Sequence, residues 1–240
     1  MTLLPLSPDD SDELAARFES RPAEELLLWA ADRFAGRITL TCSWQRQSSV
    51  LVDMLWRIGA TVRIVEIDTG LLFPETHATR DRLVERYGID VETIRPPRTV
   101  EEQAATEGPA LWSRDSDRCC ALRKVGPMER AMEGMDAWVT GIRRAQSVSR
   151  RNARKVELDA VRGLVKVQPL ADWSDEDVVG YLYRHDVPYN ALHDEGYPSI
   201  GCFPCTRAVA GGDDPRSGRW AGTAKTECGL HLPVGGAAAS

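Results

Sequence analysis

Short β-branched runs alternate with helical patterns along this chain, and the alternation limits its fold more than any other feature. Residues 50–56 and 74–87 have the apolar spacing of helices, and each follows a strand pattern. Strands joined by helices of this length form right-handed crossovers in a mainly parallel sheet. We therefore predict an α/β fold with helices on both faces of such a sheet. The candidate strands are residues 37–41, 62–68, 91–94, 137–140 and 164–167.

Different structures are predicted for the other segments of the chain. Residues 11–35 and 119–133 are expected to be helical, with a boundary near Pro127. Residues 98–118 are polar and acidic, and we expect a loop there with one turn of helix. Residues 186–224 are rich in Gly and Pro and are expected to be mostly irregular.

Length and composition indicate an ordinary globular protein. The chain has 240 residues, of which 42% are hydrophobic and 28% charged, so one domain can bury a substantial core. The net charge of −6 disfavours a general nucleic-acid binder. No window approaches a membrane span, and residues 1–10 lack a signal-peptide pattern, so we expect a cytoplasmic protein. A homo-oligomer is compatible with the sequence.

Polar segments follow three of the predicted strands. They are residues 42–49, 68–71 and 141–146. Because ligands bind at the carboxyl ends of parallel strands, these segments predict the ligand site. Residues 143–155 carry six basic side chains and no acidic one, which indicates an anion-binding loop.

Four of the six cysteines form a set that has the ligand count of a metal centre. They are Cys119, Cys120, Cys202 and Cys205. Zinc ligand pairs are usually separated by two or more residues, whereas two adjacent sulfurs are better matched to two iron atoms of an iron–sulfur cluster. The alternative is a buried adjacent pair, with only Cys202 and Cys205 acting as a redox dithiol.

The remaining two cysteines differ in their neighbours. Cys42 directly follows a strand and is predicted to be a core residue. Cys228 lies near Lys225 and His231, with Arg216 and Arg219 upstream, and such basic neighbours favour the nucleophilic thiolate. The alternative is an incidental exposed thiol. We divide the chain into an α/β domain, residues 1–209, and a mobile C-terminal segment, residues 210–240, that carries Cys228.

Several motifs resemble those of the adenylyl-sulfate and phosphoadenylyl-sulfate reductases of assimilatory sulfate reduction. They occur in the family's order at residues 119–124, 141–147, 196–206, 218–220 and 225–231. The resemblance implies an adenine-nucleotide α-hydrolase-like fold. Members with both cysteine pairs generally carry one [4Fe-4S] cluster and use adenosine 5′-phosphosulfate, and this chain resembles that group.

The resemblance also implies that a loop after the first strand holds the phosphosulfate group. In related ATP pyrophosphatases this loop reads S-G-G-x-D-S, but here Trp44 and Gln45 replace the glycines and Gln47 replaces the aspartate. These changes argue against close wrapping of a pyrophosphate and against a magnesium–ATP site. The loop's hydroxyl candidates are Ser43, Ser48 and Ser49.

By the same resemblance, Cys228 attacks the sulfate sulfur, AMP leaves, and thioredoxin or a similar dithiol releases sulfite from the S-sulfo-cysteine. Basic side chains are expected to contact the sulfonyl and phosphate oxygens. The candidates are Lys124, Arg143, Arg144, Arg151, Arg216, Arg219 and His231. Adenine and ribose are expected at strand ends, beside Asp68, Thr69, Gly70 and Gly141.

Three other functions are compatible with parts of the pattern. The first is the same reaction on the 3′-phosphorylated substrate. The second is a PP-loop nucleotide transferase, which would need ATP and which the altered loop disfavours. The third is a non-catalytic iron–sulfur sensor, which leaves residues 225–231 without a role.

Overall fold

The fold centres on one six-stranded sheet, seen in a computed structural model that describes residues 7–211, 213–223 and 225–231. The strand order is β3-β2-β1-β4-β6-β5, and every pair is parallel except β5 with β6. This confirms the predicted α/β fold with its mainly parallel sheet. The strands are β1 (Ile38–Cys42), β2 (Arg63–Ile67), β3 (Val91–Ile94), β4 (Ala137–Val139), β5 (Val156–Asp159) and β6 (Leu164–Val167).

Helices cover both faces of the sheet, and in the described residues none of them is long and apolar enough to span a bilayer. A π-helical turn, Ala121–Val125, joins α7 to α8, so residues 116–132 are helical throughout and Pro127 sits in the first turn of α8. The α-helices are α1 (Pro8–Phe18), α2 (Ala23–Arg33), α3 (Arg46–Arg57), α4 (Pro74–Tyr87), α5 (Val100–Glu107), α6 (Leu111–Arg114), α7 (Ser116–Cys120), α8 (Gly126–Met132) and α9 (Asp175–Arg184).

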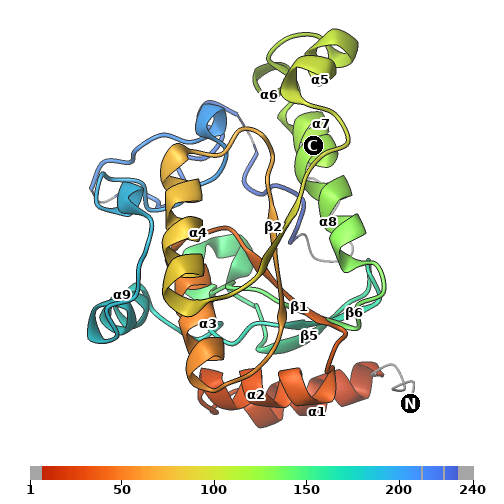
Figure 1. Cartoon of the computed structure of the whole chain (residues 1–240), viewed down its shortest axis with the longest axis vertical. Helices are drawn as coiled ribbons and strands as arrows, with labels where there is room; N and C mark the ends of the chain where they lie inside the picture. The colour runs from red at the N-terminus through yellow and green to blue at the C-terminus, as the bar shows by residue number, and fades with distance from the viewer. Residues whose placement is uncertain (1–6, 212, 224, 232–240) are drawn as a thin grey trace.

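The two faces of the sheet carry hydrophobic cores of different size. Helices α2, α3, α4 and α9 contribute to the larger core, which includes Leu26, Leu51 and Leu83. Helix α8 covers the other face, where Met128 and Trp138 belong to a smaller core. Figure 1 shows α3 and α4 on one side of β1 and β2, with α8 on the other.

A buried carboxylate ties three helices of the larger core together. Asp53 on α3 accepts hydrogen bonds from the hydroxyls of Tyr87 on α4, at 2.9 Å, and Tyr181 on α9, at 2.6 Å. Arg57, one turn further along α3, donates to the same carboxylate at 2.6 Å. Since Asp53 has no solvent exposure, its charge depends on these three partners.

The prediction of a loop over residues 98–118 was wrong. Helix α5 begins at a capping box, in which the Thr99 hydroxyl accepts from the Glu102 amide at 3.1 Å and the Glu102 carboxylate accepts from the Thr99 amide at 2.8 Å. Two short helices follow it. Strand β5 was not among the predicted strands, although it pairs antiparallel with β6 through a turn that contains Gly163 at φ 68°.

The C-terminal segment returns to the α/β domain in its described part. Leu230 packs against the smaller core, and His231 stacks on Trp138 of β4. Residues 212, 224 and 232–240 of the predicted mobile segment lie outside the described residues. The mobility of residues 210–240 stays a prediction.

Candidate active site

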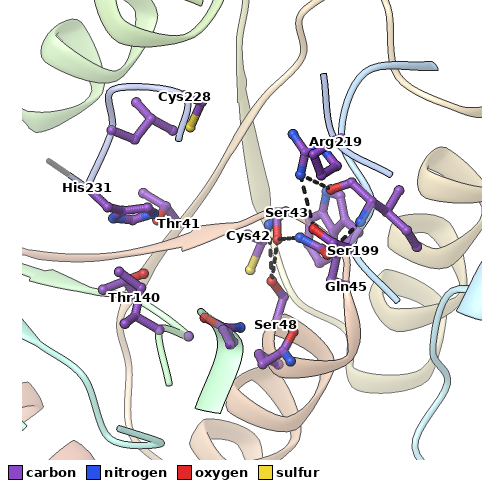
Figure 2. A pocket seen from close by; sticks show the side chains of 18 of the residues that line it. Thr41, Cys42, Ser43, Gln45, Ser48, Thr140, Ser199, Arg219, Cys228 and His231 are labelled. Atoms are coloured by element: carbon purple, nitrogen blue, oxygen red, sulfur yellow. Dashed lines mark hydrogen bonds between the residues drawn. The ribbon is translucent and has the colours of Figure 1, made fainter. Parts of the chain in front are cut away.

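A cavity of about 280 Å³ opens at the carboxyl ends of β1, β2 and β4. Its lining comes from the loops after these strands and from two segments distant in the sequence, residues 198–201 and 215–231. Figure 2 shows Cys228 and His231 at one side of this pocket and Arg219 with Ser199 at the other. The position agrees with the rule that parallel sheets bind ligands at their carboxyl edge.

The loop after β1 forms one wall of the cavity. The Ser48 hydroxyl accepts from the Ser43 amide at 3.0 Å, and both residues line the cavity. The Gln45 side chain accepts from the Ile200 amide at 2.8 Å, which ties this loop to the segment that precedes Cys202. Neutral hydrogen bonds therefore shape this wall.

Trp44 fills the place that the ATP-type loop gives to its first glycine. Its backbone has φ 55°, a left-handed conformation that costs a non-glycine residue about 1–2 kcal/mol. The side chain is buried, and its indole N–H donates to the Glu66 carboxylate at 2.6 Å. Burial of the indole and this bond offset the strain. The loop keeps a glycine-like turn while its space is filled by an aromatic ring.

Cys228 lies across the cavity from Arg219, and Arg216 and Lys124 also line the cavity. Arg219 donates to the Ser199 hydroxyl at 3.2 Å and to the Ile200 carbonyl at 3.3 Å. One thiol and three cationic side chains around the same cavity form a site suited to an anionic electrophile.

Lys124 lies between this cavity and a second, adjoining one, because it lines both. Burial opposes its charge, but the negative charge that Cys202 and Cys228 carry as thiolates outweighs burial and raises the pKa of Lys124. The ammonium group is therefore charged at neutral pH and close to both cysteines.

His231 is half-buried and stacks on the aromatic face of Trp138, with 5.1 Å between ring centroids and 12° between planes. Burial, assisted by the positive charges of Arg150 and Lys166, lowers the pKa of His231 well below its usual value. The imidazole is neutral at pH 7. Its ring lines the cavity, and its buried Nδ1 has no hydrogen-bond partner among the described residues.

The predicted metal ligands do meet. Cys119, Cys120, Cys202 and Cys205 all line the second cavity, although they come from two places in the chain. Within the part of the chain that the structure describes, no three acidic, cysteine or histidine side chains converge as they would around a single metal ion. The four thiols therefore share one cavity, and the metal centre that they would bind stays a prediction.

Two predicted site residues, Gly141 and Arg143, line the cavity and also contact other protein groups closely. The backbone of Gly141 packs so closely against Gln47 that a Cβ at this position would lie 2.7 Å from the Gln47 side chain. Arg143 also lines the cavity, but its guanidinium is buried and donates to the Trp173 carbonyl at 2.9 Å and to the Asp175 carboxylate. Arg143 thus anchors the start of α9.

Six predicted substrate contacts do not line the cavity: Ser49, Asp68, Thr69, Gly70, Arg144 and Arg151. The carboxylate of Asp68 accepts from the Gly70 amide at 2.9 Å and from Arg95 at 3.1 Å. The Thr69 hydroxyl lies 3.3 Å from Cys202 Sγ, on the side of the cysteine cavity. Ser49 is buried within α3, behind the wall.

The two outlying arginines point away from the cavity for different reasons. Arg144 forms two bonds, of 2.6 and 2.8 Å, with the Glu19 carboxylate. Arg151 is exposed and donates to the Val148 carbonyl at 3.1 Å. A run of positive charge in the sequence did not reveal which of its members face inward.

Several lining residues were not predicted, chiefly Arg150, Glu227, Trp138 and Thr140. Arg150 lies in the basic run that predicted an anion site, next to Arg151. Glu227 directly precedes Cys228, so proximity to the candidate nucleophile was the available signal. Trp138 and Thr140 follow one another on and after β4 with one residue between them, as side chains on the same face of a strand do.

The fold and the cavity define an α/β protein of the adenine-nucleotide α-hydrolase-like class. Residues 37–208 match the family described as the phosphoadenosine phosphosulfate reductase domain, and this chain belongs to that family. The fold of yeast FAD synthetase is similar too, with a TM-score of 0.57 over 86% of this chain and 70% of that one; at 16% identity, this likeness shows the fold alone.

Individual relatives are similar over most of their length. The chain is 46% identical to the adenosine 5′-phosphosulfate reductase of Rhodococcus opacus, over 92% of this chain and 95% of that protein. It is 45% identical to the protein of the same name from Geobacillus thermodenitrificans, over 89% and 92%. The phosphoadenylyl-sulfate reductase of Candida auris, solved as a phosphate complex, has a TM-score of 0.77 at 29% identity and covers 87% of this chain and 100% of that one.

Proposed function

We propose that this protein reduces adenosine 5′-phosphosulfate to sulfite and AMP in sulfate assimilation, with thioredoxin or a similar dithiol as reductant. One observation carries the proposal: Cys228, Lys124, Arg216 and Arg219 border the same cavity at the carboxyl edge of the sheet. A cavity lined by a thiol and by cations suits an anionic substrate whose sulfur accepts a nucleophile. The names of the bacterial relatives favour the substrate without a 3′-phosphate.

In the first step, the Cys228 thiolate forms a bond to the sulfate sulfur. The bond from that sulfur to the bridging phosphate oxygen breaks, and AMP leaves with its electron pair. The sulfonyl oxygens carry negative charge through this step. Lys124, Arg216 and Arg219 stabilise that charge, and the neutral His231 can donate a hydrogen bond or accept one.

In the second step, a thiolate of the dithiol attacks Cys228 Sγ, and sulfite leaves with the electron pair of the S–S bond. The second thiol of the reductant then displaces Cys228 from the mixed disulfide. The reductant is oxidised to a disulfide, the substrate's sulfur is reduced to sulfite, and the Cys228 thiol is restored.

We further propose that Cys119, Cys120, Cys202 and Cys205 hold one [4Fe-4S] cluster. Their thiols line one cavity, which supports this ligand set. When bound, such a cluster supplies fixed negative charge beside the substrate cavity. Lys124 and Arg219 border both cavities and are the cationic residues that connect that charge with the substrate's oxygens.

The test of the reaction is sulfite release from adenosine 5′-phosphosulfate with thioredoxin, beside an equal concentration of the 3′-phosphorylated nucleotide. We expect faster release from the first nucleotide. Faster release from the second would assign this chain the 3′-phosphorylated substrate, which the name of the Candida auris enzyme gives to that protein. Release from neither would reject the reductase function and leave a sensor role.

The test of the cluster is an iron and acid-labile sulfide assay on anaerobically purified protein. We expect about four of each per chain. Zinc in place of iron, or neither metal, would reject the cluster proposal without affecting the sulfite assay.

A further inference from the structure

The residue just before the proposed nucleophile makes one of the densest sets of charge contacts in the protein. The side chain of Glu227 is only 6% exposed, and both of its carboxylate oxygens are bonded. Arg150 donates to them at 2.8 and 2.9 Å, and Arg216 donates at 3.0 Å. The Ser149 hydroxyl adds a bond of 3.2 Å. A two-point guanidinium–carboxylate pair fixes orientation as well as distance.

The charges in this cluster persist at neutral pH. Burial alone would raise the pKa of Glu227, but the bonds and charge of Arg150 outweigh burial and lower it. Burial, together with the charge of Arg150, lowers the pKa of Arg216 to about 10, which still leaves the guanidinium charged at pH 7. The cluster is therefore a true ion pair with two cations on one anion.

The cluster joins the C-terminal segment to the loop after β4. Arg150 is itself held by the Gln146 side chain at 2.6 Å, within the 3₁₀ turns that follow β4. On the other side of Cys228, His231 stacks on Trp138 of β4. Cys228 is thus held between two anchors that both belong to β4 or to the loop after it.

We propose that Glu227 is a positioning residue: its pairing with Arg150 and Arg216 holds Cys228 at the cavity wall, in the position from which it attacks substrate. Rupture of the pair releases Cys228 toward the reductant. The inference rests on the proposed function, since it assigns Cys228 the attack. Neither step consumes Glu227, which acts on the reacting sulfur only through the chain next to it.

A more exposed guanidinium–carboxylate pair elsewhere in the protein, with Glu92 51% exposed, serves as the control for the substitution itself. Arg63 holds the Glu92 carboxylate through two nitrogens, at 2.9 and 2.8 Å, between β2 and β3. Neither residue lines either cavity. Glu227→Gln and Glu92→Gln therefore make the same chemical change, one beside Cys228 and one far from it.

The experiment measures two rates on anaerobically purified protein. The first is alkylation of Cys228 by iodoacetamide, followed by mass spectrometry of its peptide. For Glu227→Gln we expect a rise of about tenfold, because a neutral amide loses the charge-assisted bonds to Arg150 and Arg216. The second is S-sulfonation of Cys228 in a single turnover without reductant, which should fall at least about tenfold while the nucleotide's Kd changes little. Glu92→Gln should match the wild type in both rates.

Three outcomes would overturn the proposal. They are unchanged alkylation in Glu227→Gln, raised alkylation with unchanged S-sulfonation, and equal effects from Glu92→Gln. If Glu227→Gln does not fold, Arg150→Lys replaces it, because lysine keeps the charge but loses the two-point geometry. A wild type that releases no sulfite would reject the proposed function instead, and the alkylation comparison would still decide whether Glu227 holds Cys228.

Discussion

The two walls of the cavity are held in place by different physical means. The wall after β1 is continuous with the larger hydrophobic core, because Trp44 is buried in that core together with Leu51 and Met54 of α3. The wall that carries Cys228 is held by the ion pairs of Glu227, by the pair of Lys225 with Asp117 at 2.7 Å, by Leu230 against the smaller core, and by the stack of His231 on Trp138. Breaking the first wall means opening the larger core, whereas breaking the second means opening ion pairs and a small apolar contact.

This difference matches the proposed division of labour. A wall that must keep substrate oriented gains from a rigid core behind it. A nucleophile that must meet first a substrate and then a protein reductant needs a segment that can leave the cavity at a cost below global unfolding. The wall after β1 is thus expected to keep the substrate oriented, and the wall with Cys228 is expected to move between substrate and reductant. Each of the following variants tests one of these two expectations.

The largest effect is expected at the sulfur itself. Cys228→Ser should lower sulfite release by at least about 10³-fold, because a serine hydroxyl is a far weaker nucleophile than a thiolate. In the wild type without reductant, mass spectrometry should find one added sulfonate on the Cys228 peptide and none on Cys42, which burial keeps in the thiol form by raising its pKa. Normal release by the serine variant would refute the covalent mechanism.

The next effect concerns the core-held wall. Asp53→Ala should lower the free energy of unfolding by about 3 kcal/mol or more, because it leaves the hydroxyls of Tyr87 and Tyr181 without their buried acceptor. Urea denaturation measures this loss. Glu227→Gln, in the same assay, should cost roughly 1 kcal/mol while exposing Cys228. Similar losses in both variants would mean that the two walls do not differ in this way.

A smaller effect is expected from pH on the ion-paired wall. The pKa of His231 in the folded protein lies well below its usual 6.5, so the released segment binds a proton more readily than the docked one. Docking is therefore fully stable above about pH 6.5 and weakens as pH falls below it, by up to about tenfold per pH unit. The pKa of Glu227 is lowered from 4.5, so its contribution persists until the pH falls below that value.

Hydrogen exchange of residues 225–231, corrected for intrinsic rates, measures this pH effect at pH 8 and pH 5.5. Exchange should be faster at the lower pH. In His231→Gln, which has no group that titrates in this range, the difference between the two pH values should vanish. A difference that remains in this variant would assign the pH effect to another group.

The smallest effect serves as the baseline for ion pairs outside both walls. Arg144 and Glu19 form a partly exposed pair, and Arg144→Ala should lower the free energy of unfolding by about 0.2–1 kcal/mol. Urea denaturation of both variants gives the ratio of this loss to the loss in Asp53→Ala. A loss as large as that of Asp53→Ala would show that exposed pairs stabilise this protein as much as its buried carboxylate does.

Much of the architecture could be predicted from the sequence, because hydrophobic periodicity and the ends of strands can be recognised from a few neighbouring residues. The strands that were predicted are those with compact β-branched runs, and the larger cavity lies at their carboxyl ends. The four predicted ligand cysteines line one cavity, and their metal centre stays a prediction. In contrast, β5 has mixed polarity and is a strand because it pairs with β6, which no local pattern reports.

The detailed contacts of the site were harder to predict for a related reason. Side-chain direction in loops depends on tertiary partners, so Arg150 and Arg151 could not be told apart although only Arg150 faces the cavity. The helix at 100–107 was missed because its polar surface outweighed the capping signal at Thr99. Glu227 lies in a motif that the sequence analysis singled out, but its ion pair with Arg150, 77 residues away, could not be predicted from the motif.

Trp44 has a consequence for how such a loop can change over evolutionary time. Its indole nitrogen donates to Glu66, which is also bonded by Arg80 and Thr93. Replacing the tryptophan with glycine would relieve the backbone but would open a hole in the core and remove one donor from a buried carboxylate. A change from this loop to an ATP-type loop therefore needs several coordinated substitutions, and a single mutation at Trp44 would lower the stability of the protein.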